Sequence, residues 1–368
     1  MSKPLFTLCR ELGLALPAQL AELYRALPEG ADLGTVRLLS PAEVAAGRWR
    51  ADLSPALLPI AEEGSLDLFA LYVPPGPAAA ASVVCAVNVE TGAYAPFCSS
   101  VRGFAAWLLL LRQAQARLPM AGSLAADTRE AAGALAAAFG LEPVLGQSVE
   151  LDSGAIAAAL AAYDPSSPWA CSLLARDLAE PAAARERLAP ALAAAPFASG
   201  LLEQAAELFI ARGETGRAAR SLAAAIQRLE PNLQAAPYRL EEPSEDTWEL
   251  FEPFKPLAGV CWLREHAREI PPDFRQSAAK AFLERRLETR PGGELTLEPR
   301  EAIDFARRRG LGGDLPGGRW VLHLAFGVAR GDPEARRLLA AELEKAWRLA
   351  GSSWYANGFA QIAGGSGD

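Results

Sequence analysis

The chain has 368 residues, of which 51% are hydrophobic and 22% charged, and its formal net charge is -8 at neutral pH. This balance is typical of a globular protein and excludes a disordered tail. A sequence-independent nucleic-acid surface needs clustered, uncompensated lysine and arginine, so the acidic balance argues against nucleic acid as a partner. At roughly 150 residues per domain, the length predicts two domains.

The five cysteines form no CxxC pair and lie at no metal-ligand spacing from the two histidines, so the sequence predicts no metal site and no cofactor. An odd number of cysteines without a dense disulfide pattern favours a reducing compartment. Arg10 and Glu11 interrupt the stretch that a signal peptide would keep apolar. The apolar run at 104–111 is shorter than the ~18 residues that a membrane-spanning helix needs. We therefore expect a cytoplasmic protein without a membrane partner.

The first third of the chain mixes helical and strand patterns. Apolar residues at i, i+3, i+4 and i+7 indicate helices, and short β-branched or aromatic runs that end at proline or glycine indicate strands. The predicted elements are a helix at 16–27, a strand at 35–40, a short helix at 40–44, a strand at 66–73, a two-stranded hairpin at 82–98 and a helix at 100–118. The pattern predicts an α+β domain over residues 1–120.

Beyond residue 120 the sequence becomes rich in alanine with helical spacing, so we predict an all-helical domain over residues 121–368. Residues 201–231 are similar to a tetratricopeptide repeat, a pair of helices with small residues where the helices meet. A second pair is expected at 324–347. The two pairs show no regular period, which leaves open a true repeat array or an irregular helical domain. The positions that match the repeat are Phe209, Gly213, Ala218, Leu222 and Ala225.

The ordered motifs of residues 1–120 resemble the SUKH superfamily, which includes the Smi and Knr regulators of cell-wall assembly. "LPAQLAELYRAL" matches its opening helix, "LLSPAEV" its strand and short helix, and "FAAWL" its final helix. The most recognisable element is "LPIAEEGSLDLFAL" at 58–71, with matching positions Pro59, Ile60, Ala61, Gly64, Ser65 and Asp67. The resemblance implies a small, mostly antiparallel sheet with flanking helices.

Asp67 stands in an apolar run, where an isolated buried carboxylate would be costly. We interpret residues 62–64 as a loop that enters a strand, and we expect backbone N–H or hydroxyl donors to fix the Asp67 side chain. A structural role and a place in a partner-binding pocket both remain open for this residue. The candidate binding residues here are Glu62, Glu63, Gly64 and Asp67.

Residues 241–254 are acidic and aromatic with two prolines, a composition that indicates a loop or linker. Trp248 and Phe251 complete the candidate binding residues. Their rings either pack on the helical layer or form an exposed anchor for a basic partner. Arginines at 281–310 alternate with acids, which favours solvated helix faces over a nucleic-acid patch.

The sequence lacks the phosphate-binding, metalloprotease and nucleophile-elbow motifs that are typical of common enzyme families. His266 lies between acids on a helix, and His323 lies in an apolar run typical of a core histidine. We therefore expect a non-catalytic protein-binding protein. The SUKH resemblance implies a bacterial immunity protein that neutralises a toxin by direct binding, and the negative charge suits a basic toxin. The alternative is a regulatory adaptor that joins two partners. Oligomeric state stays open.

Overall fold

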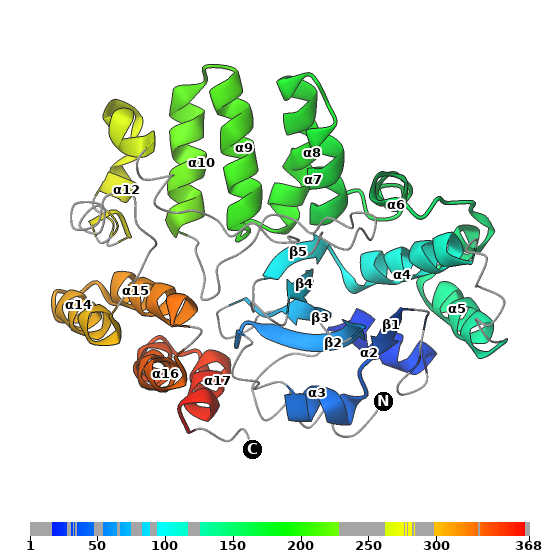
Figure 1. The fold of residues 1–368 in the computed structure, drawn as a ribbon, viewed down its shortest axis with the longest axis horizontal. Helices are drawn as coiled ribbons and strands as arrows, with labels where there is room; N and C mark the ends of the chain where they lie inside the picture. The colour runs from blue at the N-terminus through cyan, green and yellow to red at the C-terminus, as the bar shows by residue number, and fades with distance from the viewer. Residues whose placement is uncertain are drawn as a thin grey trace.

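The computed structural model describes residues 17–27, 31, 33, 35–47, 54–64, 67–74, 83–88, 94–116, 126–227, 262–275, 277, 279–281, 283, 298–329 and 332–364. Five strands and three helices make up the described part of the first third (Figure 1). In chain order they are α2 (Ala18–Ala26), β1 (Val36–Leu38), α3 (Pro41–Gly47), β2 (Leu57–Glu63), β3 (Asp67–Tyr72), β4 (Val84–Asn88), β5 (Tyr94–Cys98) and α4 (Val101–Gln115).

The strands form one antiparallel sheet in the order β1-β2-β3-β4-β5, so each strand pairs with its neighbour in sequence. This confirms the predicted antiparallel sheet with flanking helices. Six predicted elements (α2, β1, α3, β3, the β4–β5 hairpin and α4) are present. The sequence pattern missed β2, and the interpretation of residues 62–64 as a loop was wrong, because Glu62 and Glu63 lie in β2 and only Gly64 belongs to the turn.

Pro59 explains why β2 was missed. Proline cannot donate to a strand ladder and usually occurs at sheet edges or bulges. The β2–β3 register shifts between Pro59 and Ala61, so the proline lies at an irregularity of the ladder. The strand continues beyond it, because residues 57–61 are all buried.

Two of the helix starts follow from side-chain caps. At α3 the Glu43 N–H donates to Ser40 Oγ (3.2 Å), while the Ser40 N–H donates to the Glu43 carboxylate (2.7 Å). This reciprocal pair is a capping box. At α4 the Gly103 N–H donates to Ser100 Oγ at 3.0 Å. The caps satisfy N–H groups that have no partner inside a helix.

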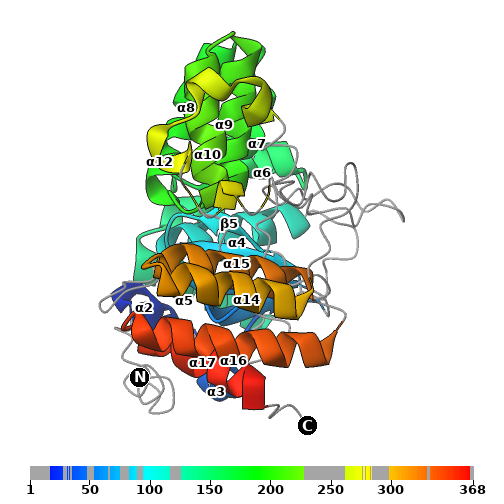
Figure 2. The same ribbon diagram turned by 90° about the vertical axis from the view of Figure 1, so that its left-hand side faces the viewer.

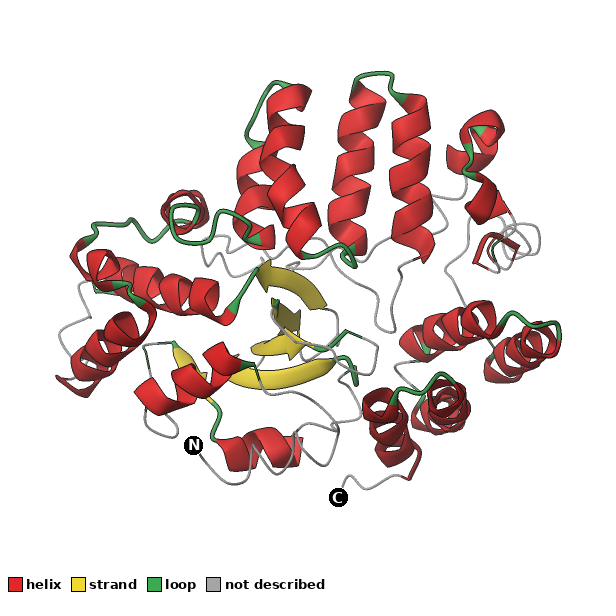
Figure 3. Ribbon diagram, turned by 180° about the vertical axis from the view of Figure 1, so that it is seen from behind, coloured by secondary structure: helices red, strands yellow, loops and turns green. Residues whose placement is uncertain are grey.

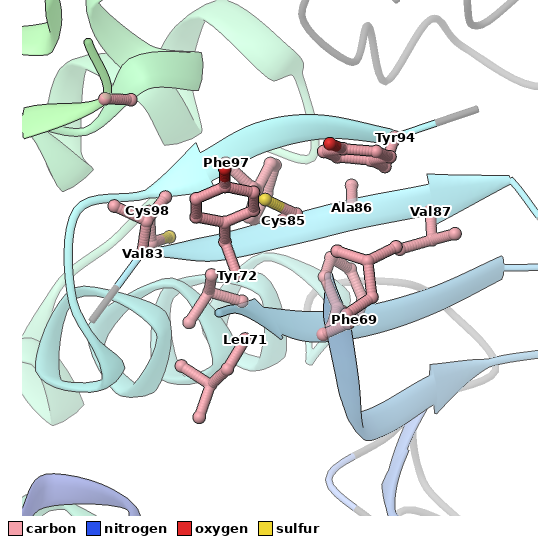
Figure 4. Packing of buried hydrophobic residues seen from close by; sticks show 14 of the residues in the cluster. Phe69, Leu71, Tyr72, Val83, Cys85, Ala86, Val87, Tyr94, Phe97 and Cys98 are labelled. Atoms are coloured by element: carbon pink, nitrogen blue, oxygen red, sulfur yellow. The ribbon is translucent and has the colours of Figure 1, made fainter. Parts of the chain in front are cut away.

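The aromatic core lies between the sheet and α4. Phe69 on β3 lies 5.0 Å from Phe104 and 4.9 Å from Trp107, measured between ring centroids. Phe97 on β5 lies 4.9 Å from Trp107, edge to face. Figure 4 shows Phe69 and Phe97 among the buried side chains of β3, β4 and β5. Rings at such distances and tilts contribute beyond the area they bury, so this layer fixes α4 on the sheet.

The remainder of the described chain is helical, as predicted. Its α-helices lie in an arc around the sheet (Figures 1 and 3). They are α5 (Ala126–Phe139), α6 (Ser153–Leu160), α7 (Pro168–Arg176), α8 (Pro181–Ala194), α9 (Ser199–Ala211), α10 (Thr215–Gln227), α12 (Pro272–Arg275), α14 (Pro299–Leu311), α15 (Leu315–Val328), α16 (Pro333–Leu349) and α17 (Ser353–Gly364).

Both predicted helix pairs are present, as α9–α10 and α15–α16. Between α9 and α10 the chain reverses at Gly213, whose φ of 70° is accessible to glycine without strain. The Glu214 N–H bonds back to the Phe209 carbonyl at 2.9 Å, which closes the turn in the manner of a Schellman motif. Ala218 and Ala225 are fully buried, so small residues lie where the helices meet, as expected.

A buried carboxylate links the α6–α7 turn to the start of α4. Asp164 is 4% exposed and accepts hydrogen bonds from the Ser99 N–H (2.9 Å) and Ser99 Oγ (2.5 Å). Burial raises the pKa of Asp164, and the Ser99 donors oppose this shift. A Cβ on Gly103 would lie 2.1 Å from Asp164 Oδ2, so only glycine fits there.

The helices of the second region contact the sheet at several points. Phe197, between α8 and α9, stacks on Tyr72 with 3.7 Å between centroids, and Ser167 Oγ donates to the Phe97 carbonyl of edge strand β5 at 2.8 Å. From α17, Trp354 Nε1 donates to the Pro55 carbonyl and the Tyr355 hydroxyl to the Val73 carbonyl. Figure 2 shows α16 and α17 on the side of the molecule opposite α7–α10. The predicted boundary at residue 120 lies outside the described residues and stays a prediction.

Candidate functional site

Most of the predicted binding residues gather where β2 turns into β3. Glu62 and Glu63 are the last residues of β2, and Gly64 is exposed with a φ of 60°. Asp67 begins β3, and its backbone pairs with Glu63 on one side and Asn88 on the other. The Asp67 side chain lies outside the described part, so the expected donors to it stay a prediction.

Glu62 belongs to a charged network at the surface of the sheet. Its partner is Arg37 on β1, the residue directly opposite it in the ladder. Arg37 Nη2 lies 2.7 Å from a Glu62 carboxylate oxygen, and Nη1 lies 3.0 Å from Glu43 at the start of α3. The three side chains are 33% to 43% exposed. Water screens such pairs, so their contribution to stability is small.

The electrostatics of this network favour the charged forms of Arg37 and Glu43. Hydrogen bonds to Glu62 and Glu43 raise the pKa of the Arg37 guanidinium. The Ser40 N–H lowers the pKa of Glu43, with smaller contributions from the Ser40 hydroxyl and Arg37. A carboxylate that accepts several hydrogen bonds favours its ionised form. At neutral pH Arg37 and Glu43 therefore present opposite charges at this surface.

Glu63 points to a second set of contacts at the same end of the sheet. Thr35 Oγ1 donates to its carboxylate at 3.2 Å, and Gln115 Nε2 at the end of α4 donates to Thr35 Oγ1 at 3.0 Å. This chain of hydrogen bonds connects β2 to α4. Glu63 thus combines a half-buried structural contact with a place beside the exposed network.

Trp248 and Phe251, the remaining predicted binding residues, lie outside the described part of the chain. The structure thus places four of the six candidates at one end of the sheet and leaves two untested. Sequence reasoning missed Arg37 and Glu43. Glu43 could have been found from the Ser40–Glu43 capping box, whereas Arg37 could be assigned only from the β1–β2 register.

Within the described residues, no three His, Cys, Asp or Glu side chains lie close enough to hold a metal ion. His266 stacks on Trp262, and its Nδ1 lies 2.9 Å from the Trp262 carbonyl. His323 is buried on α15, far along the chain from the charged network, and its Nε2 accepts a hydrogen bond from Trp347 Nε1 at 2.8 Å. The two histidines therefore have structural partners of their own.

No helix within the described ranges has both the length and the apolar character to cross a membrane. Comparisons with protein-family models, with curated proteins and with solved structures gave no match to this chain.

Proposed function

We propose that this chain is a non-catalytic protein-binding protein, and more specifically a bacterial immunity protein that neutralises a basic toxin by direct binding. The resemblance of residues 1–120 to the SUKH superfamily motivates the immunity assignment. The observation that carries the binding assignment is the acidic end of the sheet, where Glu43 and Glu62 bind the Arg37 guanidinium and Glu63 follows Glu62 at the end of β2. We call Arg37, Glu43, Glu62 and Glu63 the acidic edge.

The acidic edge suits recognition of a positively charged surface. Three carboxylates and one guanidinium leave a local excess of two negative charges, in a chain whose net charge is -8. Such complementarity steers a basic partner toward the site and accelerates association, and it adds less to the final affinity. The short strand pairing and the capping box hold the carboxylates in place, so binding requires little ordering of the site.

The alternative function is an adaptor that joins two proteins. It requires a second binding surface on the helical region, in addition to the acidic edge. The packed helix pairs α7–α8 and α9–α10 favour this alternative, because stacked helix pairs generally present a surface for partners. The two proposals differ in the number of partners and in whether one partner is toxic.

Affinity capture from a lysate of the source cells, with the intact chain as bait, tests both proposals. Each captured protein would then be expressed alone, and together with this chain, in a host that lacks both. An immunity protein predicts one stoichiometric partner that arrests growth alone and is neutralised by co-expression. Two harmless partners that bind at the same time would establish the adaptor and overturn immunity.

Charge reversal locates the binding surface. Glu62→Lys together with Glu43→Lys should slow association with a basic partner at least tenfold at low salt and leave dissociation less changed. Glu150→Lys, an exposed charge reversal outside the acidic edge, is the matched control. Equal association rates for both proteins would place the contact elsewhere.

A further inference from the structure

A groove of about 640 Å³ lies along the α7–α8 helix pair, remote in sequence from the acidic edge. Its walls are mostly apolar, and Leu178, one of the lining residues, is 42% exposed. Figures 1 and 3 show α7 and α8 side by side at the outer margin of the molecule. The lining residues are Pro165, Leu174, Asp177, Leu178, Ala183, Glu186, Arg187 and Pro190.

The lining residues have the spacing of a helix-packing seam. On α8 they recur at 183, 186, 187 and 190, and at the end of α7 they recur at 174, 177 and 178. Positions i, i+3, i+4 and i+7 share one face of a helix. The α8 stretch rises about 10 Å, which corresponds to two helical turns. The groove thus has the shape and length that receive two turns of another amphipathic helix.

Pro190 adds a polar feature to this apolar seam. A proline inside a helix has no N–H, so the carbonyl of residue Glu186 loses its usual helical donor. On the core side of the pair, the Cys171 thiol of α7 donates to the Pro165 carbonyl at 3.2 Å. Pro190 therefore removes one internal hydrogen bond of α8 beside the groove.

The charges around the groove select the occupant. Asp177 and Glu186 are exposed at its rim, and within the described residues neither forms an ion pair. Arg187 supplies one positive charge on the same wall. Two carboxylates outnumber this guanidinium, so the rim favours lysine or arginine beside an apolar ridge.

We infer that the α7–α8 groove binds an amphipathic helix of a protein partner, with aliphatic side chains on the seam and lysine or arginine against Asp177 and Glu186. The inference deepens the proposed protein-binding function by naming a surface and its ligand class. The inference depends on the proposed function in one respect, namely that the partner is a protein. The partner's toxicity plays no part in it.

Synthetic helical peptides of about 14 residues test the inference directly with the full chain. One labelled peptide carries leucine at i, i+3, i+4 and i+7 flanked by lysine, a second has glutamate in place of lysine, and a third has alanine in place of leucine. Fluorescence anisotropy measures each dissociation constant. We expect the leucine–lysine peptide to bind at least about tenfold more tightly than the other two.

Variants then assign the peptide to the groove. Leu178→Asp should weaken the leucine–lysine peptide at least tenfold, and Asp177→Lys with Glu186→Lys should reverse the preference toward the glutamate peptide. Leu338→Asp is the matched control, since Leu338 on α16 is 45% exposed and lies outside the groove. Because these side chains are exposed, we expect thermal melting to show folded variants.

The inference would be overturned by absence of peptide binding, by equal binding of the lysine and glutamate peptides, or by equal effects of Leu178→Asp and Leu338→Asp. Self-association of the wild-type chain that Leu178→Asp abolishes, without peptide binding, would make a second copy the occupant and overturn it too. Peptide binding in the groove combined with a harmless captured partner would retain the groove and reject immunity.

Discussion

The Tyr355 hydroxyl on α17 donates a hydrogen bond of 2.8 Å to the carbonyl oxygen of Val73, which follows β3 and lies 282 residues earlier in the chain. The neighbouring Trp354 indole donates to the Pro55 carbonyl just before β2. Both acceptors are backbone groups beside central strands, and both donors come from one helix. We call this pair of contacts the α17 latch.

Tyr355→Phe should lower the free energy of unfolding by about 1–3 kcal/mol, because it removes the donor and leaves the buried Val73 carbonyl unsatisfied. Urea unfolding followed by circular dichroism measures the change. Tyr163→Phe is the matched control, since its half-buried hydroxyl accepts from Gln147 Nε2 and its loss should cost less. Equal losses for both variants would contradict the structural importance of the latch.

Gly103→Ala should destabilise the protein by about 3 kcal/mol, because the new methyl group would displace Asp164 from its two bonds to Ser99. Thermal unfolding compares it with Gly133→Ala. A Cβ at Gly133 on α5 meets no atom within 4 Å, so that variant should stabilise the helix by about 0.5–1 kcal/mol. Similar signs for the two changes would contradict the close approach at Gly103.

His323 should make stability fall in acid. Burial, with a smaller contribution from the Arg319 guanidinium, lowers the pKa of His323 to about 3, from 6.5 in an exposed histidine. Below pH 6.5 His323 therefore binds a proton in the unfolded chain, whereas in the folded chain it stays neutral down to about pH 3. In that window stability should fall by up to about 1.4 kcal/mol per pH unit as pH decreases.

The difference between wild-type and His323→Gln isolates this contribution from the carboxylates that also titrate. Glutamine keeps an acceptor for Trp347 and cannot take up a proton in this range. Urea unfolding from pH 4 to pH 8 should give a shallower dependence of stability on pH for His323→Gln than for the wild type. His266→Gln is the control, because it leaves His323 in place. Identical slopes for His323→Gln and the wild type would rule out a neutral buried His323.

The buried cysteines should resist alkylation in the native protein. Burial raises the pKa of Cys171 to about 11 and raises the pKa values of Cys85 and Cys98 still further above their usual range. Few thiolates exist at pH 8, and the sulfur atoms are covered. Iodoacetamide labelling with peptide mass spectrometry should modify these three sites only after urea is added. Rapid native labelling at Cys171 would reveal local opening of the α7–α8 pair.

The sequence predicted the elements whose local signals agree with each other. The 100–118 pattern carries apolar residues on one helical face, and α4 runs from Val101 to Gln115. The prediction failed at β2 because Pro59 and the following acids and glycine have the composition of a turn. Long-range pairing with β1 and β3 overrides that local preference.

At the candidate site, too, long-range pairing could not be predicted from local sequence signals. The acids of "AEEG" stood out as a motif, but their partner Arg37 lies 25 residues away from Glu62 and is chosen by strand register. The groove was missed for a different reason. The α8 sequence "PAAARERLAPALAA" is alanine-rich with weakly separated faces, and nothing local tells which face α9 covers. Packing between helices decides what remains exposed.

The α17 latch also bears on the order in which the chain folds. Bringing Val73 and Tyr355 together across 282 residues in an unstructured chain costs about 5 kcal/mol of loop-closure entropy, before any constant term. Helix pairs such as α9–α10 and α15–α16 close over far shorter distances and contract the loop first. We therefore expect the latch to be among the last contacts made during folding. In stopped-flow measurements, Tyr355→Phe should unfold faster than the wild type and refold at an almost unchanged rate.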